Sequence, residues 1–169
     1  MKILTLGNEL LRQKAVLVAH IGGEYLAIAE KMLTALHAED GIGLAGPQIG
    51  LMERIFVTHV ADDIPRVFIN PSILETSQEM VKFEEGCLSI PGMYSNVVRP
   101  VAVKVQAWNE KGRPFTIEAS GLLARVIQHE YDHLEGTLFI DRIPEEKKNR
   151  IIAKVEAKAA EKAATVQQE

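Results

Sequence analysis

The sequence predicts one α+β domain, in which antiparallel or mixed β-sheets surround a central helix and a further helix ends the chain. Segments rich in Ile, Val and Phe fill the middle of the chain, between residues 54 and 118, as is typical of strands. Apolar residues recur at helical spacing in residues 24–39, 120–136 and 144–166. With 169 residues and no internal repeat, low-complexity linker or domain boundary, the chain suits a single domain over residues 1–169.

The composition excludes several classes of protein. Apolar residues make up 47% and charged residues 25%, which are ordinary proportions for a globular domain. The net charge of −4 indicates no nucleic-acid footprint, and no apolar run is long enough to cross a membrane. The N-terminus lacks the features of a signal peptide, and the one cysteine fits a reducing compartment. We therefore expect a cytoplasmic location.

The first fifty residues are expected to contain one helix and one glycine-rich loop. Residues 2–6 read as a short strand or an extended arm. Residues 24–39 place Tyr25 and Met32 on one apolar face, which predicts a helix packed on the core. Residues 40–50 hold four glycines and a proline, which forbid a stable helix. This loop either brings its backbone close to a ligand or is a long connection with turn glycines, and composition does not decide between them.

The middle of the chain is predicted to form strands separated by turn residues. The predicted strands are residues 54–60, 65–70, 72–76, 97–108 and 114–118. Asn70-Pro71 is expected to force a break or a bend between the second strand and the third. Residues 137–140 read as short and extended. The last helix, 144–166, has apolar residues at four-residue spacing and a Glu and Lys face, which predicts a packed helix with one solvated side.

The helix predicted between Ser120 and Gly136 carries the motif Gln128–His133. His129 and His133 lie one turn apart on the same face, about 6 Å along the axis, so both imidazoles can bind one metal ion. Glu130 falls within the apolar arc, where a carboxylate needs a partner such as a metal-bound water. Two histidine ligands and a general base on one helix form the His-Glu-x-x-His pattern, although a pattern with three fixed positions also occurs by chance.

A catalytic site of this kind needs a third protein ligand and one open position. No histidine or glutamate follows His133 at the spacing that is common in zinc peptidases. Cys87, the only cysteine, is the natural third ligand, because a thiolate suits iron or zinc. The alternative is that Cys87 is a small buried apolar side chain, which is common for a free cysteine. Beside the motif helix, the ligand interpretation is favoured.

Three stretches together resemble the peptide deformylases, in the order and spacing of that family. They are Gly41–Gln48, Glu85–Ser89 and Gln128–Leu134. The resemblance runs from the first strand to about Arg142, and the last helix is the least family-specific part. One departure is Gly46, where the family more often has alanine, and we expect it to loosen the loop slightly.

The resemblance implies an enzyme that removes the N-formyl group from formyl-methionine at the start of newly synthesised polypeptides and releases formate. It implies one divalent metal ion held by Cys87, His129 and His133, with a bound hydroxide that attacks the formyl carbonyl. Glu130 would accept the proton of the water and later donate one to the leaving amine. Fe²⁺ is expected in the cell, with Zn²⁺ and Ni²⁺ as alternatives, because a Cys-His-His site binds all three.

The resemblance also implies how the substrate is held. The Leu88 backbone N–H and the Gln48 side-chain amide would stabilise the developing charge on the formyl oxygen. Gly43 would bond the substrate backbone, and glycine permits that close approach. The substrate would lie extended, like an added strand. Leu122 and Val126 project beside the first histidine of the motif, so they are expected to form the wall of the methionine pocket.

Three charged residues near these motifs have roles that the motifs do not fix. Arg125 lies one turn before His129, and it is either at the mouth of the pocket or solvated. Glu85 and Arg99 are expected to pair with each other or to orient a ligand histidine.

Two other functions stay open at this point. A metallopeptidase would use the same helix on ordinary peptide bonds, but its downstream ligand is missing. A structural metal-binding domain would have no use for Glu130 beside an open coordination position. The expected partners are formyl-methionine nascent polypeptides, and a nascent-chain substrate suggests contact with the ribosome near its exit tunnel. Neither nucleic acid nor a membrane is expected as a direct partner.

Overall fold

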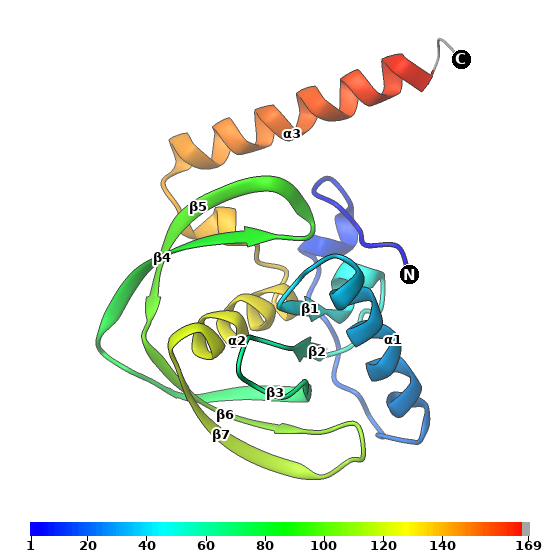
Figure 1. Ribbon diagram of the computed structural model, residues 1–169, viewed down its shortest axis with the longest axis vertical. Helices are drawn as coiled ribbons and strands as arrows, with labels where there is room; N and C mark the ends of the chain where they lie inside the picture. Colours follow the sequence, from blue (N-terminus) through cyan, green and yellow to red (C-terminus); the bar gives the residue numbers. More distant parts are fainter. Residues whose placement is uncertain (167–169) are drawn as a thin grey trace.

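The computed structural model describes residues 1–166 and has an α+β architecture with two antiparallel sheets (Figure 1). The larger sheet has five strands in the order β1-β2-β3-β6-β7. These strands are β1 (Gly43–Ala45), β2 (Ile55–Thr58), β3 (Arg66–Thr76), β6 (Ala102–Trp108) and β7 (Pro114–Ser120). The smaller sheet pairs β4 (Met80–Cys87) with β5 (Ile90–Pro100). The predicted fold class is confirmed, with antiparallel pairing in every sheet of the described residues.

Helix α2 (Gly121–Leu134) lies at the centre of the molecule, between the small sheet and the large one (Figure 1). The other helices are α1 (Glu24–Ala38), α3 (Glu145–Val166) and the short 3₁₀ turns η1 (Glu9–Arg12), η2 (Gly46–Ile49) and η3 (Phe139–Arg142). Ser120 stands at the N-cap of α2, but its side chain makes no capping hydrogen bond. The motif helix is therefore held by packing on both sides, and most of its residues from Ala124 onward are buried.

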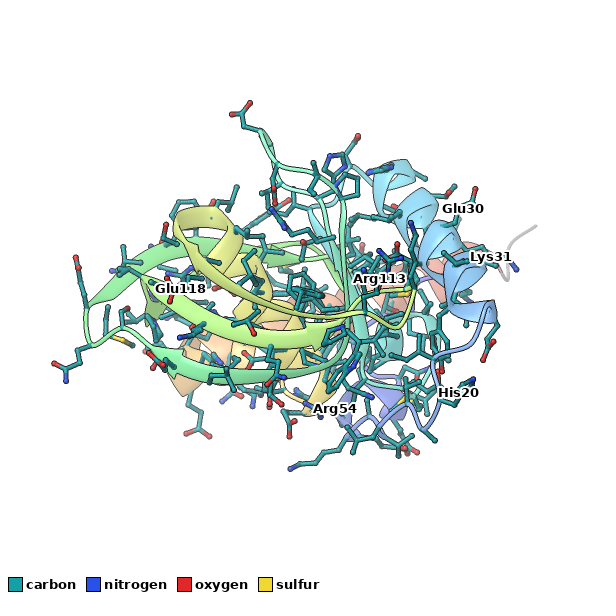
Figure 2. The ribbon with its side chains drawn as sticks, turned by 90° about the horizontal axis from the view of Figure 1, so that it is seen from below. His20, Glu30, Lys31, Arg54, Arg113 and Glu118 are labelled. Atoms are coloured by element: carbon teal, nitrogen blue, oxygen red, sulfur yellow. The ribbon has the colours of Figure 1, made fainter. Side chains whose placement is uncertain are left out.

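The core consists of three apolar clusters. The first lies between the large sheet and α2 and includes Phe56, Phe68 and Ile127. The second packs α1 against β1, β2 and β3, and the third joins β5, η3 and the start of α3. Figure 2 shows the solvent side of α1, with Glu30 and Lys31 at the opposite end of the view from Glu118 on β7. Within the described residues, no helix combines the length and apolarity needed to span a bilayer.

Of the predicted break or bend at Asn70-Pro71, the structure has the bend, because β3 runs through these residues as one strand with a bulge. The register of β3 against β6 shifts between Ile69 and Ser72. Asn70 adopts φ 48°, and its side chain makes 2.9 Å hydrogen bonds with both the N–H and the C=O of Val18. The irregular residue is thus stabilised by a partner from the N-terminal region, and the strand continues beyond it.

Two sequence predictions are corrected. Residues 97–108 do not form one strand, because the chain leaves the small sheet at the end of β5 and enters the large sheet as β6. Residues 137–140 are not simply extended, since η3 begins at Phe139. The prediction for α3 holds only near its start, where Ile151 is buried and Val155 half-buried. The side chains from residue 156 to residue 165 are exposed.

Candidate metal centre

The last residue of β4 meets the motif helix at one point. The sulfur of Cys87 and one ring nitrogen each of His129 and His133 lie within 4.8 Å of one another. Cys87 Sγ is 3.4 Å from His133 Nε2, and the two imidazole centroids are 5.1 Å apart. Among the described residues this is the one such group of three possible ligands. The structure therefore brings together the three predicted metal ligands.

The two histidines have opposite pKa shifts. Burial lowers the pKa of His129, but its contacts with Cys87 and Glu85 outweigh burial and hold that pKa well above its usual value. His129 Nδ1 lies 2.9 Å from Glu85 Oε2, which leaves Nε2 as the free ring nitrogen. Burial, reinforced by the neighbouring His129, holds the pKa of His133 well below its usual value, so His133 is neutral. A thiol and two imidazoles suit iron, zinc or nickel, and three protein ligands leave an open position. The residues fit a divalent transition metal.

Glu130 is a buried carboxylate that lacks a full set of partners. Its side chain is 3% exposed, and Oε2 has no hydrogen-bond partner within residues 1–166. Burial raises the pKa of Glu130 to about 7. A Cβ on Gly43 would lie 2.3 Å from Glu130 Oε1 and 2.7 Å from Val126 Cγ1. Glycine at this position therefore leaves the space that the carboxylate occupies.

Gln48 is fully buried on η2, and its amide nitrogen faces the ligand group. Gln48 Oε1 accepts a hydrogen bond from the Ala45 N–H at 2.8 Å. Gln48 Nε2 donates to Ser89 Oγ at 3.1 Å and lies 3.6 Å from Cys87 Sγ. The bond from Ala45 fixes which end of the amide is the donor, so a nitrogen donor stands beside the sulfur.

The ligand group opens into a cavity of about 450 Å³. Its walls come from the loop before β1, from β4 and β5, and from the first half of α2. The predicted site residues that line it are Gly43, Gln48, Cys87, Leu88, Leu122, Val126, His129 and Glu130. Val126 is 4% exposed, whereas Leu122 is 41% exposed and stands nearer the rim. His133 is not part of this lining and lies behind the other two ligands.

Arg125 is not a solvated arginine, because its side chain is buried between α2 and the small sheet. It donates to Glu85 Oε1 at 2.8 Å, to the Val81 carbonyl at 2.7 Å and to the Val97 carbonyl at 3.0 Å. It also lines the cavity, beneath the ring of Phe83. The solvated interpretation is therefore wrong, and a position at the mouth of the pocket stays a prediction.

Glu85 and Arg99 pair in the way that the sequence suggested. Arg99 donates to both oxygens of Glu85, at 2.6 and 3.0 Å. Sequence reasoning missed Asp132, which accepts from Arg99 at 2.8 Å and from Arg142 Nη2 at 2.6 Å. Its position inside the motif, next to a ligand histidine, was the one available signal.

Gly46 does not loosen the glycine-rich loop. A Cβ at this position would lie 2.6 Å from the Leu51 carbonyl oxygen and 2.9 Å from the Glu53 carbonyl oxygen. Because both neighbours are backbone atoms, an alanine here would require residues 51–53 to move. The loop is thus tightly packed at Gly46, and the expectation of a looser loop is wrong.

Comparison with known proteins gives a consistent result. The family model for polypeptide deformylase matches residues 1–149. The peptide deformylase of Clostridium botulinum is 51% identical over 136 residues, which cover 80% of this chain and 91% of that protein. The peptide deformylase of Borreliella burgdorferi is 46% identical over 153 residues, which cover 90% and 93%.

Solved structures agree with this assignment. The peptide deformylase of Ehrlichia chaffeensis superimposes with a TM-score of 0.91 at 35% identity, covering 96% of this chain and 98% of that one. A peptide deformylase from Synechococcus elongatus, in complex with actinonin, has a TM-score of 0.87 at 42% identity, covering 91% and 86%. The chain therefore belongs to the polypeptide deformylase family.

Proposed function

We propose that this enzyme removes the N-formyl group from formyl-methionine at the start of newly synthesised polypeptides and releases formate. The observation that carries the proposal is the buried Glu130 carboxylate, which lines the same cavity as Cys87 and His129 and has one oxygen without a hydrogen-bond partner within residues 1–166. A buried base next to three metal ligands suits hydrolysis, because water must lose a proton as it attacks. Family membership supports the choice of a formylated peptide as substrate.

The metal would be held by Cys87, His129 and His133, and it would supply Lewis acidity that activates water and polarises the formyl carbonyl. Glu130 accepts the proton of the attacking water and later returns one to the leaving amine. A pKa of about 7 allows both roles near neutral pH. We propose Fe²⁺ as the ion in the cell, with Zn²⁺ and Ni²⁺ as alternatives.

The developing negative charge falls on the formyl oxygen. Gln48 Nε2 and the Leu88 N–H are the proposed donors to it. The position of the Gln48 amide, which is buried and oriented by Ala45, supports this role because a fixed donor needs no reorganisation during the reaction. During turnover this amide would share its protons between Ser89 and the substrate.

The peptide would lie extended in the cavity, with its backbone against Gly43. The methionine side chain would pack against Val126 and Leu122, which form an apolar wall about one and two turns before His129. This arrangement places the first side chain of the substrate inside and the rest of the nascent chain toward the open rim. Contact with the ribosome near the exit tunnel, and a cytoplasmic location, stay predictions.

The test is formate release from a formyl-methionine peptide by anaerobically purified protein, with metal measured on the same sample. E130Q is expected to keep about one metal ion per chain and to lose turnover by several orders of magnitude. C87A is expected to lose both metal and turnover. Cleavage of an unformylated peptide at an internal bond, without formate release, would reject the proposal in favour of a metallopeptidase.

A further inference from the structure

The N-terminal arm joins two segments of the site that lie far apart in sequence. The Leu4 N–H donates to the Gln48 carbonyl at 2.7 Å, and the Leu6 N–H donates to the Ser89 carbonyl at 2.8 Å. Gln48 belongs to η2, whereas Ser89 lies in the turn between β4 and β5. In Figure 1 the arm is the dark blue segment that runs from the N-terminus toward η1. Residues 3–6, here named the strap, thus contact both segments at the same time.

The side chains of the strap are anchored in two different parts of the core. Ile3 packs against the cluster beneath α1, and Leu88 packs against the same cluster. Leu6 packs against the cluster beneath α3, as does Cys87. Each end of the strap therefore shares an apolar cluster with a residue of the site.

The two segments also meet through side chains on the cavity side. Gln48 Nε2 donates to Ser89 Oγ at 3.1 Å, and the same nitrogen lies 3.6 Å from Cys87 Sγ. The strap connects the backbones of Gln48 and Ser89, and the hydrogen bond from the Gln48 amide connects their side chains. In catalysis Gln48 Nε2 would donate to the substrate as well as to Ser89 Oγ. The backbone hydrogen bonds of Leu4 and Leu6 would stay the same.

We propose that the strap positions Gln48 and Leu88 relative to each other, so that both donors reach the formyl oxygen together. This inference rests on the proposed function, since it assigns the strap to the stabilisation of charge in that reaction. Donors of this kind act through their preset position, and a displacement of about 1 Å can cost about 100-fold in rate. The strap residues are positioning residues and do not touch the substrate.

The experiment removes one N–H at a time. L4P and L6P each lack the backbone donor, while L4A and L6A keep it and lose only the side chain. K2P is the matched proline control, because the Lys2 N–H makes no hydrogen bond within the described residues. L4P and L6P are expected to lower kcat by about 10- to 100-fold. KM and the metal content should stay close to the values of the wild-type chain, and the alanine variants should lose far less of kcat.

Two results would overturn the proposed positioning role of the strap. The first is a loss of kcat in L4P and L6P that is no larger than in K2P or in the alanine variants. The second is a rise of KM with kcat unchanged, since that pattern means lost binding of substrate and transition state alike.

A measurement on the wild-type chain covers the case in which the proline variants do not fold. The amide protons of Leu4 and Leu6 are expected to exchange with solvent slowly, whereas those of Lys2 and Thr5 exchange fast. Equal, fast exchange at all four amides would show that the strap is not held by these hydrogen bonds, and it would reject the proposed positioning role. Formate release by the wild-type chain tests the proposed function separately, so failure of the strap and failure of the function give different results.

Discussion

Gly43 shows how one missing side chain determines the geometry around the base. A Cβ at position 43 would lie 2.3 Å from Glu130 Oε1, so G43A is expected to displace the carboxylate or the loop. We predict a fall of about 100-fold in kcat/KM, measured by formate release, with little change in the melting temperature. The matched control is G23A, because a Cβ on Gly23 meets nothing within 4 Å. Equal activity of G43A and G23A would contradict this account of the site.

Tyr25 gives a prediction about alkaline pH. Its hydroxyl donates to Glu53 Oε2 at 2.7 Å, and burial together with Glu53 raises the pKa of Tyr25 to about 12. A raised pKa stabilises the folded state below the unfolded pKa of about 10, and this contribution is lost as pH rises toward 12.

Y25F removes that pH dependence. At pH 8 it is expected to lower the free energy of unfolding by about 1 kcal/mol, the value of one hydrogen bond. Between pH 10 and pH 12 the difference from the wild-type chain should shrink and then reverse, as measured by urea unfolding at each pH. A difference that is constant across this range would show that Tyr25 does not ionise there.

Three elements are held together by the side chain of Arg125. It reaches from α2 to Glu85 and the Val81 carbonyl on β4 and to the Val97 carbonyl on β5. R125M keeps most of the stem and removes the hydrogen bonds to Glu85 and to the two backbone carbonyls. We predict a loss of about 2 kcal/mol in the free energy of unfolding.

The same variant should weaken the metal site through Glu85, which orients His129. The metal affinity of R125M, measured by competition with a chelator, is expected to fall by about 10-fold. R150M is the control, because Arg150 is 71% exposed on α3 and, among residues 1–166, pairs only with Glu146. An unchanged affinity in R125M would mean that Arg99 alone is enough to hold Glu85.

The sequence predicted best those elements whose pattern is local. The helices at 24–39 and 120–136 follow from their apolar spacing, and they differ from α1 and α2 by at most two residues at any end. The strand through Asn70 was not predictable, because its bulge is stabilised by Val18 from another part of the chain. The change of sheet between β5 and β6 was not predictable either, because it does not alter the alternation of apolar and polar residues along residues 97–108.

The residues of the site were likewise predictable only where their pattern is local. His129, Glu130 and His133 could be placed together from the helical period alone, and Cys87 entered as the only cysteine. The burial of Arg125 and the role of Asp132 depend on partners from distant strands and turns, so a single sequence does not reveal them.

At the scale of the whole molecule, α3 lies across one end of the fold, and only its first part joins the core (Figure 1). Ile151 is buried against the third apolar cluster, whereas the side chains from 156 to 165 are exposed. Removal of residues 160–169 is therefore expected to change the free energy of unfolding by no more than about 0.5 kcal/mol and to leave kcat/KM unchanged.

I151A tests whether the first part of α3 is packed into the core. Truncation of a buried isoleucine is expected to cost about 2–4 kcal/mol in the free energy of unfolding, because it removes apolar contacts and leaves a cavity beneath η3. Its kcat/KM at 25 °C should stay near that of the wild-type chain, since Ile151 is not among the residues that line the cavity. If the truncated chain lost as much stability as I151A, the distal part of α3 would have to contact the core, contrary to the exposure of its side chains.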